Sequence, residues 1–217
     1  MLVTLLLRVH VAAGTVALLS LWIPLVTKKG GRVHRRAGWV FVVAIAVLAA
    51  TALAVCAIRV LDPSSDRGPG AIFLAFLALL ASSSAFYGVR ILRQKGRTGP
   101  HGGLVDLGVT SLFAACSAAL LVYGVSRGSV LSICFAVLGL LLSARQLRTL
   151  LRPPPFRQFW WTNHMFGMGT ASIATVTAFL VVNFGGHMVV WLLPPLAGGA
   201  GISVWIRRYE RRLREPS

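Results

Sequence analysis

Histidines are the side chains of this sequence with the widest chemical use, because imidazole ligates metal ions and haem iron and exchanges protons near neutral pH. Three of the five, His34, His101 and His164, stand at or near the beginning of long apolar stretches. A helix N-terminus disfavours positive charge, so His164 should keep the neutral form that ligates metals. With Asp106, these three histidines are the candidate ligands of one shared metal site.

Asp106 also has a purely structural interpretation. It falls within the first turns of its predicted helix, where the helix macrodipole favours a carboxylate. Its depth in that helix nearly equals the depth of His164 in another, so the two side chains meet if those helices are neighbours. The sequence leaves both interpretations open.

His10 lies deeper in its own apolar stretch, and Gly14 follows one helical turn later on the same face. A glycine there lets another helix or a flat ligand approach closely. His10 is therefore either a core histidine with a hydrogen-bond partner or a cofactor ligand. It lies in the opposite half of the membrane from His164, so one haem cannot take both. The candidate cofactor-binding residues are His10, His34, His101 and His164.

A proline pair, Pro194-Pro195, interrupts the last apolar stretch and is followed by the small residues 198–201. Proline lacks the N–H of a helical hydrogen bond, so the pair predicts a kink. Interrupted helices near the bilayer midplane mark the binding sites of many transporters. Pro194 and Pro195 are therefore candidate residues of a transport pathway. The alternative is close packing of small residues around a structural kink.

The cysteines and the known zinc motifs add little metal chemistry. Cys56, Cys116 and Cys134 each stand alone in an apolar stretch, which is typical of small buried hydrophobes. The sequence contains no His-x-x-Glu-His, His-Glu-x-x-His or Cys-x-x-Cys pattern. It therefore lacks the zinc signature of soluble enzymes.

The elements that must position these residues are membrane helices. The 217 residues are 56% hydrophobic and 12% charged, which leaves too few polar side chains for the surface of a soluble protein. About 20 apolar helical residues cross a bilayer. The segments that suffice are Leu2 to Val26, Ala37 to Val60, Gly70 to Leu92, Gly102 to Val125, Ser129 to Leu150, Phe159 to Asn183 and Met188 to Ile206. The short separators leave no room for a second domain, so residues 1–217 are expected to form a single all-α domain with seven transmembrane helices.

The basic residues predict the orientation of these helices, because cytoplasmic loops retain Lys and Arg. Eighteen of the 22 lie in alternate connections and the C-terminal tail, at residues 28–36, 90–97, 145–157 and 207–214. The N-terminus is therefore expected outside and the C-terminus in the cytoplasm. The formal net charge of +17 is interpreted as contact with anionic lipid headgroups at the cytoplasmic loops. Without a nucleic-acid-binding module in the sequence, nucleic acid is not expected as a partner.

Several segments together resemble the bacterial membrane proteins catalogued as domain of unknown function 2306. These segments are residues 10–15, residues 29–38, His164 with Met168, and residues 173–183. The resemblance implies a multi-pass helical protein of the bacterial cytoplasmic membrane and no particular activity. The motif positions that it implies are His10, Gly14, His34, Gly38 and His164. His101 and Asp106 lie outside these motifs.

The first expected function is binding of a histidine-ligated cofactor, haem b or a divalent metal, for redox or related chemistry. The alternative is a carrier for a small molecule or ion, with the proline pair in its pathway. Seven helices without a detectable inverted repeat would make a small carrier, so a homo-oligomer is possible. A further alternative is a membrane-embedded zinc hydrolase acting on lipid, whose parts would be His34, His101, His164 and Asp106. Whether the protein is an enzyme stays open.

Overall fold

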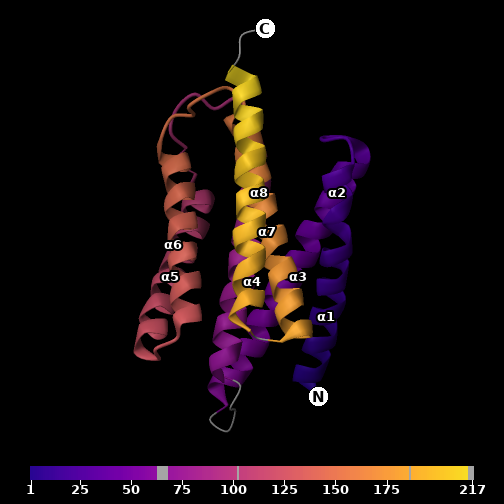
Figure 1. Ribbon diagram of the computed structural model, residues 1–217, viewed down its shortest axis with the longest axis vertical. Helices are drawn as coiled ribbons and strands as arrows, with labels where there is room; N and C mark the ends of the chain where they lie inside the picture. The colour runs from indigo at the N-terminus through magenta and orange to yellow at the C-terminus, as the bar shows by residue number, and fades with distance from the viewer. Residues whose placement is uncertain (63–67, 102, 186, 215–217) are drawn as a thin grey trace. The chain divides into compact units, whose positions relative to one another are not determined.

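The computed structural model describes residues 1–62, 68–101, 103–185 and 187–214, and the regular structure within these ranges is entirely helical (Figure 1). The elements are α1 (Leu2–Ser20), α2 (Trp22–Val26), α3 (Arg32–Leu61), α4 (Gly68–Arg90), the 3₁₀ helix η1 (Ile91–Gln94), α5 (Leu104–Ser126), α6 (Val130–Leu151), α7 (Phe159–Phe184) and α8 (Met188–Arg214). The predicted all-α class is confirmed. Gly102, the predicted first residue of the fourth span, lies outside the described residues.

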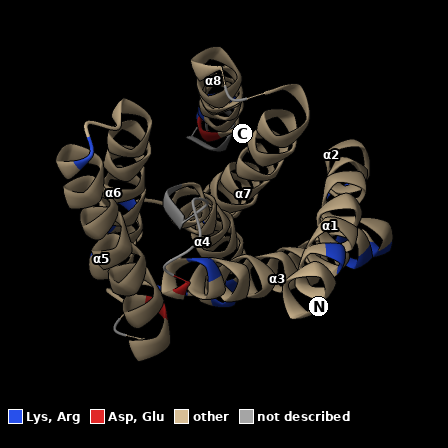
Figure 2. Ribbon diagram, turned by 90° about the horizontal axis from the view of Figure 1, so that it is seen from below, with Lys and Arg blue, Asp and Glu red and all other residues tan. Residues whose placement is uncertain are grey.

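The described part of the chain contains seven helical spans long and apolar enough to cross a membrane, and each coincides with a stretch predicted from the sequence. Most of the ribbon carries neither a basic nor an acidic residue (Figure 2). The chain is therefore a multi-pass membrane protein by helix length and composition. The outward N-terminus and cytoplasmic C-terminus remain predictions.

Two helices are longer than the sequence predicts. α3 begins at Arg32 instead of Ala37, and α8 continues past Ile206 to Arg214. The added turns are rich in arginine, which is a good helix former. Hydropathy marks only the part of a helix that lies in hydrocarbon, so it misses such polar turns.

The first span contains a short irregularity. α1 ends at Ser20 and α2 begins at Trp22, with Leu21 between them in helical backbone conformation. Pro24 lacks the N–H that would bond to the carbonyl of Ser20, four residues earlier. The lost hydrogen bond accounts for the division of one predicted span into two helices.

The chain folds into two compact units. Unit 1 consists of Met1–Ser82 and Ala171–Pro194, and unit 2 consists of Ser83–Thr170 and Pro195–Ser217. All three divisions fall inside helices, namely α4, α7 and α8. Neither unit is therefore a continuous segment followed by a linker.

Unit 1 is organised by α1 packed along α3. His10 of α1 donates its Nδ1 hydrogen toward the Leu48 carbonyl and the Thr51 hydroxyl of α3, at 3.2 and 3.0 Å. One turn along α1, a Cβ at Gly14 would meet Leu48 Cδ1 at 3.5 Å, an ordinary van der Waals distance. The two helices are thus joined by a polar contact beside close but unstrained packing.

Unit 2 contains the hairpin of α5 and α6, which pack side by side. Gly128 makes the turn with a φ of +62°, and the Ser129 side chain caps α6 by accepting from the Ser132 amide. Elsewhere in this unit α4 and α7 cross with their backbones in contact. A Cβ at Gly167 would lie 2.7 Å from Gly88 Cα, so only glycine fits that crossing without displacement.

α8 runs without a break through Pro194 and Pro195. The expected interruption of this helix is therefore not observed in the secondary structure. The prolines nevertheless coincide with the point at which α8 passes from unit 1 to unit 2. Their place in a transport pathway remains a prediction.

Candidate functional site

Asp106 is the centre of a charged cluster in unit 2. It lies in the first turn of α5, and its side chain is only 5% exposed. Arg90, at the end of α4, donates from Nε to Oδ1 at 2.7 Å and from Nη2 to Oδ2 at 2.8 Å. A two-point contact of this kind is among the strongest that a carboxylate makes in proteins. The first-turn position predicted for Asp106 is confirmed, and its counter-ion is Arg90.

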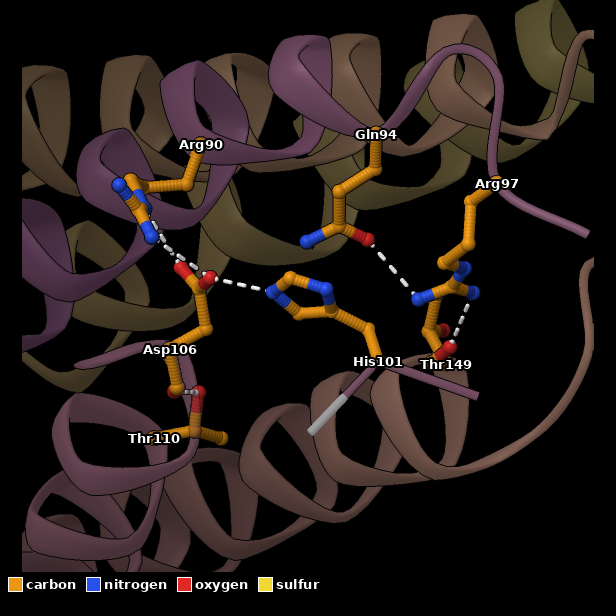
Figure 3. Close-up of polar contacts among 7 residues, drawn as sticks. All are labelled: Arg90, Gln94, Arg97, His101, Asp106, Thr110 and Thr149. Atoms are coloured by element: carbon orange, nitrogen blue, oxygen red, sulfur yellow. Dashed lines mark hydrogen bonds and ion pairs between the residues drawn. The ribbon is translucent and has the colours of Figure 1, made fainter. Parts of the chain in front are cut away.

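His101 approaches the same carboxylate from the other side (Figure 3). Its Nε2 lies 2.7 Å from Asp106 Oδ2. Because an ionised carboxylate only accepts hydrogen bonds, His101 Nε2 is the donor to Asp106 Oδ2. The His101 amide donates to the Leu150 carbonyl at 2.7 Å, which ties the connection before α5 to the end of α6.

Arg97 extends the cluster along the connection between η1 and α5. Its guanidinium donates to Gln94 Oε1 and to the Thr149 carbonyl, at 2.8 and 2.7 Å. It also stacks on the Phe159 ring, with 4.7 Å between Cζ and the ring centroid. Burial lowers the pKa of Arg97 from its ordinary value, yet a guanidinium stays charged in proteins. Arg97 is therefore a fixed cation.

These residues surround an open recess of roughly 290 Å³. Its lining residues are Arg90, Arg93, Gln94, Gly96, Arg97, His101 and Asp106. Its three arginines outnumber its one aspartate by two, so the recess carries an excess of positive charge. Arg93 is exposed and makes no hydrogen bond or ion pair with any described residue, so its donors face solvent. The recess is therefore positively charged, and the hydrogen-bond donors of Arg93 are not used by any described residue.

A second layer of hydrogen bonds holds the helices behind the recess. The Tyr87 hydroxyl donates to Asn163 Oδ1 at 3.0 Å, and Asn163 Nδ2 donates to the Phe159 carbonyl at 2.8 Å. His164 Nδ1 donates to the Gly88 carbonyl at 2.7 Å, beside the glycine crossing of α4 and α7. The start of α7 is thereby fixed against the part of α4 that carries Arg90.

The other sequence-predicted histidines use the same nitrogen. His34 Nδ1 lies 3.2 Å from the Pro24 carbonyl, and His10 Nδ1 lies 3.2 Å from the Leu48 carbonyl. A carbonyl oxygen only accepts, so Nδ1 carries the proton in both rings, as it does in His164. In each of these three rings Nδ1 is thus the donor to a backbone carbonyl. Many metal-ligating histidines likewise donate one ring N–H to an outer partner.

The structure joins only part of the predicted metal set. Within unit 2, His101 contacts Asp106, whereas His164 bonds to the Gly88 carbonyl. Among the described residues, no three His, Cys, Asp or Glu side chains are grouped closely enough to hold a metal ion. The arrangement therefore gives the shared metal site no geometric support.

Sequence reasoning missed the arginines of the cluster. The positions of Arg90, Arg93 and Arg97 in the sequence predict only the topology of the spans. The available signal was Asp106 itself, because a carboxylate at the end of a membrane helix needs a cation and the preceding connection is basic. Which arginine it takes depends on the path of residues 95–103, and hydrophobic periodicity does not encode that path.

Comparison with known proteins gives no matching family model, no matching curated protein and no matching solved structure. The resemblance carried by the motif histidines therefore stays an expectation.

Proposed function

We propose that this chain is a multi-pass protein of the bacterial cytoplasmic membrane that binds a small anion of the phosphate class in the recess of unit 2. The observation that carries this proposal is the convergence of Arg90, Arg93 and Arg97 on one recess whose acidic lining residue is already paired. Following the predicted orientation, we place the recess on the cytoplasmic side.

Phosphate suits the recess in shape and in charge. Guanidinium groups present planar forks of N–H donors that match the oxygens of phosphate. The recess volume of roughly 290 Å³ is at the small end of ligand cavities, which favours a compact anion over a large cofactor. The excess of positive charge suits a negatively charged phosphate group.

Asp106 has a positioning role in this proposal. Its two oxygens hold Arg90 in place, so that the remaining donor atoms of that guanidinium have a fixed direction. The same carboxylate fixes the His101 ring at the wall of the recess. A site whose donors are held by a surrounding layer loses less entropy when its ligand binds.

Binding of inorganic phosphate to the purified full-length protein tests the proposal by isothermal titration calorimetry. One charge-assisted hydrogen bond contributes about 1.5–3 kcal/mol, so Arg93→Gln should weaken binding by about tenfold or more. Arg127→Gln is the matched control, because Arg127 is an exposed arginine at the other end of α5. Equal phosphate affinities of the wild type, Arg93→Gln and Arg127→Gln would refute the recess as the binding site.

A second candidate function, binding of haem or a metal, has one specific observation in its favour at His10. Its Nδ1–H is held by Leu48 and Thr51, and its Nε2 has no hydrogen-bond partner among the described residues. That nitrogen is therefore available to a ligand. An absorption spectrum before and after dithionite, with metal analysis of the same sample, tests this function. A spectrum without a Soret band and a sample without metal would exclude it.

A further inference from the structure

The recess lies at the ends of two membrane spans. Its arginines belong to the end of the span Gly70–Gln94 and to the connection that follows, and Asp106 belongs to the beginning of the span Leu104–Ser126. Consecutive spans joined by a short connection have these ends on the same side of the bilayer. The cationic lining is therefore at the depth of lipid headgroups rather than in the hydrocarbon.

Aromatic residues of unit 2 mark the same level. Lys95 Nζ lies 4.6 Å from the Trp160 ring centroid. The Trp161 and Tyr209 rings pack edge to face with 4.5 Å between their centroids. Trp and Tyr concentrate at the interface between hydrocarbon and headgroups. Their position beside the connection that carries the arginines agrees with a recess that opens at this interface.

The exposed face of α5 is apolar and begins in the first turn of the helix, at the residues just before Asp106. Leu104 and Val105, just before the buried Asp106, are 87% and 58% exposed, and Leu112 two turns later is 64% exposed. These side chains share one face of α5, while Asp106 is on the buried face. A chain that left the recess past the first turn of α5 and followed this face would therefore meet apolar side chains.

We propose that the natural occupant of the recess is the phosphate of a membrane lipid with a phosphomonoester headgroup, whose acyl chains follow the exposed face of α5. This inference rests on the proposed anion site and names its ligand. A phosphomonoester carries about 1.5 to 2 negative charges near neutral pH, close to the excess positive charge of the recess. The recess has room for a phosphate group, and its positive charge disfavours a headgroup that carries a cation of its own. Free phosphate shares the chemistry of the headgroup but lacks the chains.

Native mass spectrometry of the detergent-purified full chain separates the two sources. The probes are dioleoyl phosphatidate, dioleoyl phosphatidylcholine, glycerol 1-phosphate and inorganic phosphate. We expect phosphatidate to bind at least about tenfold more tightly than the other three. The double variant Arg93→Gln/Arg97→Gln should lose about tenfold or more in affinity for phosphatidate and for both soluble phosphates.

The apolar part of the inference has its own matched pair of variants on α5. Val105→Ser should weaken phosphatidate severalfold and leave glycerol 1-phosphate unchanged. Val122→Ser is the control, because Val122 is also exposed on α5, at 71%, but lies near its far end. It should change neither ligand.

The other outcomes each decide the matter. If soluble phosphates bind as tightly as phosphatidate and depend on the arginines, the lipid inference falls and the anion site stands. If phosphatidate binds equally well to the double variant, the lipid is held at the general protein surface and the inference falls. If none of the four probes binds in an arginine-dependent way, the inference and the proposed anion site both fall.

Discussion

The His10 contact of unit 1 and the Asp106 cluster of unit 2 bury polar groups in different ways. His10 is a neutral ring that one helix neighbour satisfies with a carbonyl and a hydroxyl. Asp106 is a carboxylate that takes a cation from the end of α4 and a histidine from the following connection. A buried neutral group needs hydrogen bonds, whereas a buried charge also needs counter-charges, so Asp106 organises a whole connection around itself.

The largest difference between the two regions is expected when each acceptor is removed. Asp106→Ala leaves Arg90 and His101 without their partner and should lower the free energy of unfolding by about 3 kcal/mol. The estimate is at the low end for a buried pair because the Arg90 side chain is 25% exposed. Denaturant unfolding in detergent, followed by tryptophan fluorescence, measures the loss. Thr51→Val, which removes one acceptor of His10, is the reference variant. A smaller loss in Asp106→Ala than in Thr51→Val would contradict the expectation that the buried charge contributes more than the buried neutral ring.

The glycines of the two units provide the next contrast. Gly167→Ala places a methyl group 2.7 Å from Gly88 Cα and should destabilise the protein by about 2 kcal/mol through overpacking. Gly14→Ala meets Leu48 at an ordinary 3.5 Å and should be neutral or slightly stabilising. Thermal unfolding measures the stability of both variants. Equal melting temperatures would show that the α4–α7 crossing accommodates a methyl group at position 167 without cost.

Arg97→Lys tests whether position 97 needs a planar guanidinium or only a positive charge. Lysine keeps the charge but loses the planar fork that bonds Gln94 and the Thr149 carbonyl and stacks on Phe159. We expect a loss of about 1.5 kcal/mol in unfolding free energy and weaker phosphate binding. Arg127→Lys, at an exposed position, should change neither quantity. Phosphate affinity at the wild-type level in Arg97→Lys would show that charge alone suffices.

The smallest effect is expected at the neutral site. Thr51→Val removes the hydroxyl that accepts from His10 but leaves the Leu48 carbonyl 3.2 Å from the same nitrogen. The loss should be about 0.5–1 kcal/mol, because one acceptor remains. Urea unfolding of the purified variant measures it. A loss comparable to that of Asp106→Ala would mean that His10 also depends on a charge or a ligand.

The spans were predictable from the sequence because hydrocarbon imposes one rule on every crossing segment. The turns at Arg32 and Arg214 were not, since they lie at the polar ends where that rule no longer acts. The sequence identifies His101 and Asp106 as candidate site residues. It does not identify their partner Arg90, because its contact depends on how the chain returns between two spans rather than on any period in the sequence.

The location of a heavy tetrahedral oxyanion tests the central claim most directly. Crystals of the full-length protein soaked in tungstate, which resembles phosphate in shape and charge, would be measured at the tungsten absorption edge. We predict an anomalous peak in the recess, within reach of Arg90, Arg93 and Arg97. A recess without a peak, with tungstate bound only at the basic residues of other connections, would contradict the anion site.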